Sequence, residues 1–279
     1  MSLQQEDELQ RRTRDAEHAW HDKLYGAHAA TAYPASAQEF RRLFINQHLT
    51  PFCDGGWSWW ADAQREMIDE LGDLRGRRVL DYGCGFGNLG IYLSLCGADV
   101  WGFDISHPAI ETANRAALRY GLSAQFAQMD AASLTYRNES FDLVVGFGVL
   151  HHVIKYPGSA RELYRVLKPG GAGVFEETLW DNPFINFARR FTTVDSDAGD
   201  AALTERELRS FGSDFRKIRL EKRHLLYMLK RLAPLPIHDP AAVVQARPFW
   251  RAVKTLDRQL LRLGALQRFC GEVIVFLQK

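Results

Sequence analysis

The sequence predicts an α/β fold, a doubly wound and mostly parallel sheet with helices on both faces. From Arg78 onward, short apolar runs alternate with single helical stretches, which is the pattern of a parallel sheet. A glycine-rich loop follows the first of these runs, where cofactor-binding sheets of this class place their loop. The chain of 279 residues, 46% of them hydrophobic, is long enough for one large core or two modest ones.

Seven runs are expected to form strands, in the order RVLDYG, ADVWGFD, SAQFAQMD, FDLVVGFG, AGVFEET, FRKIRLEKR and GEVIVFLQ. Helices are expected over NLGIYLSLCG, over PAIETANRAALRYG, which Pro108 opens, and over SARELYRVLKPGG, which Pro169 and Gly170 end. Residues 1–77 have helical patterning and are expected to form an N-terminal helical cap. Residues 78–279 then form the α/β domain, with helical insertions at about 180–212 and 224–270.

Charge and cysteine content narrow the class of protein. The formal net charge of +1 argues against bulk electrostatic binding of nucleic acid, so no such partner is expected. Residues 216–279 are nevertheless basic, with 14 of the 35 Lys and Arg and only 4 of the 34 Asp and Glu. The four cysteines form no C-x-x-C pair, so neither a disulfide framework nor a zinc site is expected. The polar N-terminal stretch resembles neither a signal peptide nor a membrane span, and a cytoplasmic protein is expected.

The loop DYGCGFGNLG, residues 81–90, fits two cofactor patterns. Read from Gly85 it is the G-x-G-x-x-G of a dinucleotide-binding turn, and read from Asp81 it is the D-x-G-x-G-x-G that holds S-adenosylmethionine. Asp104, at the end of the second strand, suits the ribose of either cofactor. Asp81 is a poor neighbour for a pyrophosphate but a good one for the ammonium of methionine, and Asp130 can accept from an adenine amine. These two carboxylates favour S-adenosylmethionine over a dinucleotide.

With these motifs in order, the chain resembles the class I S-adenosylmethionine-dependent methyltransferases over roughly residues 75–178. The resemblance implies a Rossmann-like seven-stranded sheet with an antiparallel last strand. It also implies S-adenosyl-L-methionine as cofactor and methyl transfer to an oxygen, nitrogen or carbon of a small, partly apolar molecule. The cofactor-binding residues that it implies are Asp81, Gly83, Cys84, Gly85, Gly87, Asn88, Asp104, Ile105, Asp130, Ala131, Phe147, Gly148 and His152.

A bacterial small-molecule group of this family is similar over a further segment, EETLWDNPFINFARRFTT. Its matching positions are Glu177, Asn182, Pro183, Asn186, Arg189 and Arg190. The N-terminal Glu17, His21 and Asp22 are similar to that group's leader helix. Neither segment identifies a substrate.

Three residues are candidates for catalysis, namely His151, His152 and Glu177. Methyl transfer from a sulfonium is an in-line displacement in which alignment does most of the work, and a base is needed only when the acceptor is protonated. Either histidine could supply that base or orient the acceptor, and Glu177 competes for the same role. Strand alternation should turn Glu176 to the opposite face.

Several alternatives stay open. Glu17, His18, His21 and Asp22 could ligate a metal, but surface or lid residues are the expected interpretation, and no metal is expected. Aromatic and aliphatic residues of the cap segments suit an apolar acceptor: Trp57, Trp59, Trp60, Phe184, Phe187, Leu225, Tyr227 and Met228. Alternative functions are a protein that binds S-adenosylmethionine without methyl transfer, a membrane-surface lipid methyltransferase and a dinucleotide oxidoreductase.

The stretch RPFWRAVKTLDRQLLRLG predicts a basic amphipathic helix that ends at Gly264. Its apolar stripe contains Phe249, Val253, Leu256, Leu260 and Leu263, and Arg251, Lys254, Arg258 and Arg262 lie opposite. One interpretation is a lid whose apolar face packs on the domain. The other is a contact with an anionic membrane or a lipid-like substrate.

Overall fold

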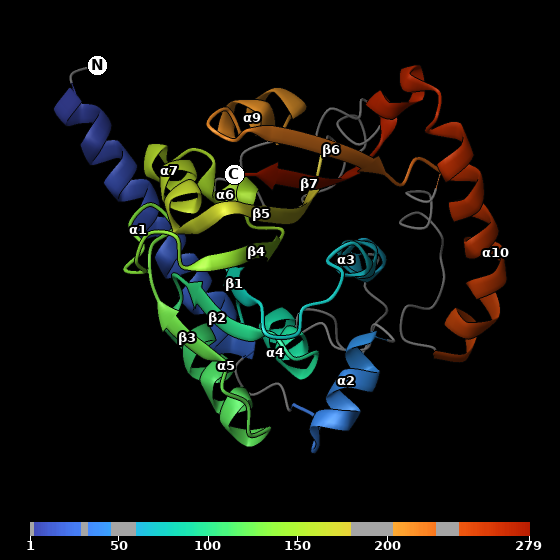
Figure 1. Ribbon diagram of the computed structural model, residues 1–279, viewed down its shortest axis with the longest axis horizontal. Helices are drawn as coiled ribbons and strands as arrows, with labels where there is room; N and C mark the ends of the chain where they lie inside the picture. Colours follow the sequence, from blue (N-terminus) through green and yellow to red (C-terminus); the bar gives the residue numbers. More distant parts are fainter. Residues whose placement is uncertain (1–2, 29–32, 46–59, 180–202, 227–239) are drawn as a thin grey trace.

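The centre of the computed structural model is one seven-stranded sheet (Figure 1), and the structure describes residues 3–28, 33–45, 60–179, 203–226 and 240–279. The strand order is β3-β2-β1-β4-β5-β7-β6. The strands are β1 (Arg78–Tyr82), β2 (Asp99–Asp104), β3 (Gln125–Gln128), β4 (Phe141–Phe147), β5 (Leu167–Thr178), β6 (Lys217–Arg223) and β7 (Glu272–Gln278). All pairs among β1 to β5 are parallel, and β7 runs antiparallel to both β5 and β6. The predicted fold class and the antiparallel last strand are therefore confirmed.

The point at which the strand order reverses fixes the place of the site. The chain runs outward from β1 through β2 to β3 and then returns to β4 on the other side of β1. The parallel pairs place Leu80 beside Trp101 of β2 and Val144 of β4. In sheets of this kind, ligands bind outside the carboxyl ends of the strands at this reversal. The loops after β1, β2, β3 and β4 are the ones that meet there.

Helices cover both faces of the sheet, because successive strand residues point to opposite sides. The helices are α1 (Leu3–His28), α2 (Ala37–Ile45), α3 (Trp60–Asp69), α4 (Asn88–Leu95), α5 (His107–Arg119), α6 (Leu150–Val153), α7 (Pro157–Val166), α9 (Glu205–Phe211), α10 (Pro240–Leu260) and the 3-10 helix η2 (Gly264–Phe269). One core cluster joins Leu80 and Tyr82 to α6, α7 and α9. The other joins Val79 to α4, α5 and the helices before the sheet.

The helix before β5 is shorter than predicted. It ends at Val166, and Leu167 is already extended (φ −72°, ψ 137°) and paired with Phe141 of β4. Lys168 precedes Pro169, and the residue before a proline is disfavoured in helical geometry. The chain therefore leaves the helix ahead of Pro169 rather than at it.

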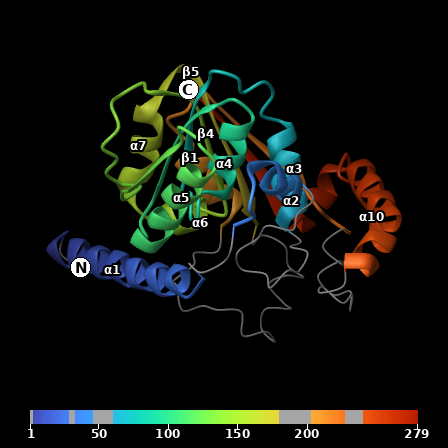
Figure 2. The same cartoon turned by 90° about the horizontal axis from the view of Figure 1, so that it is seen from below.

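The N-terminal residues divide between two positions. Figure 2 shows α1 as a separate rod along one side of the domain. The helices α2 and α3 instead belong to the packed domain, since Phe40 and Met67 are fully buried in the second core cluster. Both Figure 1 and Figure 2 place α10 at the opposite margin from α1. No helix in the described part of the chain has the length and hydropathy that a bilayer span requires.

Candidate functional site

The loop between β1 and α4 depends on its glycines. Gly83, Gly85 and Gly87 have φ angles of +67°, +51° and +78°, a region that side chains with a Cβ rarely adopt. A Cβ on Gly83 would lie 2.3 Å from Cγ2 of Val149, in the loop after β4. The loop after β1 thus packs directly on the loop after β4.

Asp81, the first carboxylate of the site, lies under this loop and is buried. Its Oδ2 accepts the backbone N–H of Gly90 at 2.8 Å, so the carboxylate occupies the N-terminal end of α4, where a negative charge is favoured. Burial, opposed by the N–H of Gly90 and reinforced by the negative charge of Asp104, raises the pKa of Asp81 to about 7. A positively charged ligand would reverse this effect.

Asp104, the second carboxylate, is buried at the end of β2. Its two oxygens accept the backbone N–H groups of Gly85 at 2.9 Å and Ser106 at 3.0 Å. Burial raises the pKa of Asp104 even though both N–H groups and the nearby His21 lower it. Asp81 and Asp104 are thus two buried like charges beside one glycine loop, an arrangement that favours a cationic ligand and disfavours a pyrophosphate.

The loop after β3 supplies a third carboxylate. Oδ1 of Asp130 accepts the backbone N–H of Ala132 at 2.8 Å, and Oδ2 lies 3.2 Å from Nη1 of Arg14 in α1. Ala131 is buried, and the carbonyl of Ile105 accepts from the side chain of Gln128. The loops after β2 and β3 are therefore tied together next to Asp104.

The loop after β4 is organised by one carboxylate from β5. Glu177 is fully buried, and its Oε1 accepts the backbone N–H groups of Val149 at 2.7 Å and Leu150 at 2.5 Å. Its Oε2 lies 2.8 Å from Nδ1 of His151. Phe147 and Gly148 lead into this loop, with Gly148 at a φ of +56°. Glu177 is thus engaged on both oxygens and positions His151.

His152 has a different environment from His151. Its ring lies 4.1 Å from that of His151 and 5.0 Å from that of His21. Burial, together with the nearby His151, His21 and Lys155, lowers the pKa of His152 to about 2. At neutral pH His152 is an uncharged ring that packs between two other imidazoles. His151, by contrast, is partly exposed and paired with Glu177.

The helix α1 lies along these loops and contacts each of them. Oδ1 of Asp22 accepts Oγ–H of Ser106 at 2.7 Å and the N–H of His107 at 3.1 Å. The hydroxyl of Tyr25 lies 2.7 Å from the position that a Cβ on Gly85 would take, next to Asp81 and Asp104. Burial and these charges raise the pKa of Tyr25 well above its usual value. Tyr25 is therefore part of the wall around the glycine loop.

Other residues of α1 fix the helix in place. Glu17 is buried and bonds to Lys155 and to the hydroxyl of Tyr156. Within the described residues, no group of three or more His, Cys, Asp or Glu could hold a metal ion. Glu17, His18, His21 and Asp22 all lie in α1.

Sequence reasoning did not single out Arg14, Tyr25 or Ser106. The signal for the first two was their spacing, since positions three and four apart share one helix face with Glu17, His21 and Asp22. The predicted loop positions Cys84 and Asn88 lie in the glycine loop and at the start of α4. Outside the described residues lie Trp57, Trp59, Phe184, Phe187, Tyr227 and Met228, together with Asn182, Pro183, Asn186, Arg189 and Arg190.

Comparison with known proteins gives matches to one family. Residues 79–171 match a family described as a methyltransferase domain. A ubiquinone biosynthesis O-methyltransferase of Pseudomonas putida (strain GB-1) is 38% identical over 117 residues, which are 42% of this chain and 50% of that protein. One of the same name from Alkalilimnicola ehrlichii is 32% identical over 162 residues, 53% of this chain and 65% of that protein. The chain thus spans about half the length of the first curated relatives that it matches.

Solved structures share the fold at low identity. A crystal structure of an S-adenosylmethionine-dependent methyltransferase from Mesorhizobium loti has a TM-score of 0.55 and 21% identity, and the match covers 80% of this chain and all of that one (100%). The crystal structure of the cyclase SpnF has a TM-score of 0.56 and 22% identity, covering 89% of this chain and 98% of that one. At such identities the likeness concerns the fold.

Proposed function

We propose that this protein, whose residues 79–171 match a family described as a methyltransferase domain, methylates a hydroxyl group of a small molecule with S-adenosylmethionine as donor. The observation that carries the proposal is the pair of buried carboxylates, Asp81 and Asp104, beside the glycine loop. S-adenosylmethionine has an ammonium and a sulfonium against one carboxylate, so its net positive charge partly offsets the charge of this pair. A dinucleotide would add negative charge to it.

The described residues fit that cofactor. On this proposal Asp104 accepts from ribose hydroxyls, Asp130 from the exocyclic amine of adenine, and Asp81 from the ammonium of the methionine tail. The positive φ angles and close packing of Gly83 and Gly85 leave backbone as the lining of the loop. When bound, the cofactor supplies an electrophilic methyl group on a sulfonium that leaves as a neutral thioether.

The protein contributes a base and its orientation. A carboxylate only accepts, so Nδ1 of His151 carries the proton that bonds to Glu177, and on this proposal Nε2 is the nitrogen that takes a proton from the acceptor. Glu177 then stabilises the imidazolium that forms, as in other carboxylate–histidine pairs. Proton removal is required for a hydroxyl acceptor, which is why an oxygen is preferred here over a nitrogen with a free lone pair. The two relatives described above are named O-methyltransferases, which agrees with this choice.

Two experiments test the proposal. Titration calorimetry with S-adenosylmethionine and with NAD should give binding of the first only, and the opposite result would indicate a dinucleotide enzyme. Incubation with methyl-labelled S-adenosylmethionine and a panel of phenols, catechols and aliphatic alcohols should then label a product in wild type but far less in His151→Gln. Cofactor binding without labelling of any acceptor would favour the alternative of a binding protein without methyl transfer, which is compatible with a fold that a cyclase also has.

A further inference from the structure

One prediction for α10 was a lid whose apolar stripe packs on the domain. In the structure, much of that stripe is exposed instead. Phe249 and Leu256 lie two helical turns apart on one side and are 63% and 49% exposed. Leu263, just after the helix ends at Leu260, continues the series at 60% exposure. Gly264 does not end the helix as predicted but opens η2. The predicted apolar stripe therefore faces outward at three of its positions.

Polar and aromatic residues form the inner face instead. Trp250 and Asp257, each one position after Phe249 and Leu256, are 8% and 2% exposed. The carboxylate of Asp257 accepts the backbone N–H groups of Leu225 at 2.9 Å and Leu226 at 2.8 Å. These contacts after β6 fix which side of the helix meets the domain.

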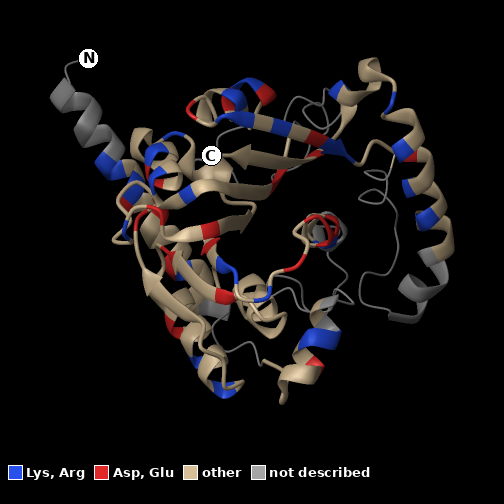
Figure 3. Ribbon diagram, in the orientation of Figure 1, with Lys and Arg blue, Asp and Glu red and all other residues tan. Residues whose placement is uncertain are grey.

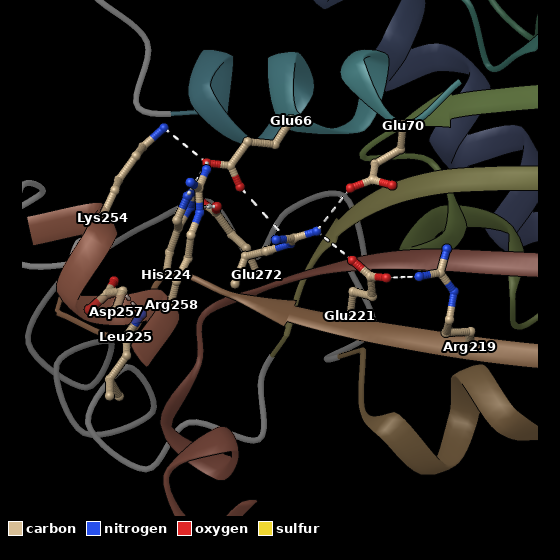
Figure 4. Close-up of polar contacts among 11 residues, drawn as sticks. Glu66, Glu70, Arg219, Glu221, His224, Leu225, Lys254, Asp257, Arg258 and Glu272 are labelled. Atoms are coloured by element: carbon tan, nitrogen blue, oxygen red, sulfur yellow. Dashed lines mark hydrogen bonds and ion pairs between the residues drawn. The ribbon is translucent and has the colours of Figure 1, made fainter. Parts of the chain in front are cut away.

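Ion pairs to α3 hold the same orientation. Nζ of Lys254 lies 3.1 Å from Oε1 of Glu66, and Nη2 of Arg258 lies 3.9 Å from the same atom. Figure 4 shows Lys254 and Arg258 reaching toward Glu66. Because charges, backbone groups and the buried Trp250 bind the inner face, the helix is positioned with Phe249 and Leu256 left exposed.

The outward apolar residues are concentrated at this one place. The large hydrophobic residues that the described part of the chain leaves exposed are Leu118, Phe249, Leu256 and Leu263, and three of these four belong to α10 and the turn after it. Isolated exposed apolar residues are common in soluble proteins, whereas a contiguous set marks an interaction site.

The charge of this surface is of one sign. Between Pro248 and Phe269 the exposed charged residues are Arg251, Arg258, Arg262 and Arg268, and the single acidic residue of the segment, Asp257, is buried. Figure 3 shows the basic positions along α10. The outward side of α10, with exposed Phe249, Leu256 and Leu263 along one flank and exposed Arg251 and Arg262 along the other, is hereafter called the outer α10 surface.

We infer that the outer α10 surface docks on an anionic lipid bilayer. Apolar side chains that enter the interface and arginines that pair with lipid phosphates are the two components of peripheral membrane binding. A second copy of this chain would bring arginine against arginine, so charge favours the bilayer over self-association. The inference does not depend on the proposed methyl transfer.

Vesicle flotation of the full chain tests the inference. Wild type should float with vesicles of phosphatidylcholine and phosphatidylserine, float weakly with phosphatidylcholine alone, and be released by high salt. Phe249→Gln with Leu256→Gln should abolish flotation. Arg251→Gln with Arg262→Gln should lower the vesicle affinity by about tenfold to thirtyfold, at about one kcal/mol for each cation near the surface.

A matched control is Leu118→Gln, which removes an 82% exposed leucine from α5 and should float as wild type does. Circular dichroism of each variant should match wild type, because the substituted positions are exposed. The inference is overturned if wild type does not bind anionic vesicles, or if both double variants bind as well as wild type. It is also overturned if sedimentation shows a dimer that Phe249→Gln with Leu256→Gln dissociates while vesicle binding is absent.

Discussion

Nδ1 of His151 lies 2.8 Å from Oε2 of Glu177, a carboxylate that is fully buried at the end of β5. The other oxygen of Glu177 accepts two backbone N–H groups of the loop that carries His151. One buried group therefore fixes both the ring and the backbone of the proposed base. Its effect on catalysis is expected to run through His151.

Glu177→Gln should lower kcat while leaving the affinity for S-adenosylmethionine within about threefold of wild type, since an amide weakly supports an imidazolium. His151→Gln should lower kcat by about 10² to 10⁴ and remove the acid limb of the pH–rate profile. Steady-state kinetics and calorimetry measure both quantities. His107→Gln, an exposed histidine of α5, is the control. A loss of cofactor binding in Glu177→Gln would show that its role lies in holding the loop rather than the base.

Asp104→Asn should weaken binding of S-adenosylmethionine by about 1.5–3 kcal/mol, because ribose hydroxyls lose a charged acceptor. The matched control is Asp99→Asn at the other end of the same strand, where the carboxylate is half exposed and lies 3.8 Å from Arg78. Calorimetry should separate the two variants. Equal affinities would contradict the assignment of Asp104 to the cofactor.

The affinity for S-adenosylmethionine should rise between about pH 6 and about pH 8. The pKa of Asp81 is raised to about 7 in the free protein, and only the deprotonated carboxylate attracts an ammonium. Binding should therefore release protons, which calorimetry detects as a dependence on the ionisation enthalpy of the buffer. In Asp81→Asn this proton release should disappear along with most of the affinity.

The same ionisation of Asp81 should lower the free energy of unfolding of the ligand-free protein as pH rises, whereas it raises the affinity for S-adenosylmethionine. The native state holds a proton on Asp81 between about pH 4 and about pH 7, where the unfolded chain has released it, so stability from this group falls as pH rises through that range. Asp81→Asn should consequently raise the melting temperature at neutral pH by a few degrees, by about 2–4 °C for each kcal/mol. A lower melting temperature would show that the carboxylate stabilises the loop in its charged form.

His224 should contribute to stability over a wide pH range. It is buried between Glu272, to which Nδ1 bonds, and Glu66, 3.6 Å from Nε2. Although burial lowers the pKa of His224, the two carboxylates outweigh it and raise the value to about 10. Because the pKa of His224 is raised in the folded protein, its contribution to the free energy of unfolding is complete below about pH 6.5. That contribution is lost as pH rises through about 10. Figure 4 shows this cluster beside α10.

His224→Gln should therefore lower the free energy of unfolding by about 3–5 kcal/mol at neutral pH, since the buried Glu272 loses its cation and Glu66 loses one of its cations. Chemical denaturation measures this loss, and His107→Gln again serves as the exposed control. If the loss is the same at pH 7 and at pH 11, the charge of His224 is not the source of its effect.

The sheet could be predicted from the sequence because apolar runs, glycine loops and strand-end carboxylates are local signals. Asp81, Asp104 and Asp130 each follow a strand, and parallel topology alone brings such positions to one edge. The roles of His151, His152 and Glu177 could not be separated in this way. They depend on which oxygen of Glu177 faces which donor, and that is set by packing between β4 and β5.

Residues outside the strand pattern were harder to foresee. Tyr25 reaches Gly85 only because α1 lies across the loops, a long-range contact that periodicity does not encode. The side of α10 that meets the domain is not the apolar stripe that a lid would turn inward. Asp257 bonds to the backbone after β6 and Lys254 pairs with Glu66, and these contacts set the inner face. The amphipathic pattern alone could not show that these polar contacts would determine the inner face.

Gly83, Val149 and Glu177 form a continuous link between the loop after β1 and the loop after β4. A methyl added at Gly83 would strike Val149, whose backbone N–H is held by the same carboxylate that orients His151. Engineering of new acceptor preferences should therefore succeed more readily through the surrounding cap segments than through this link. Substitutions along this link would disturb the loop after β1 and the loop after β4 at once.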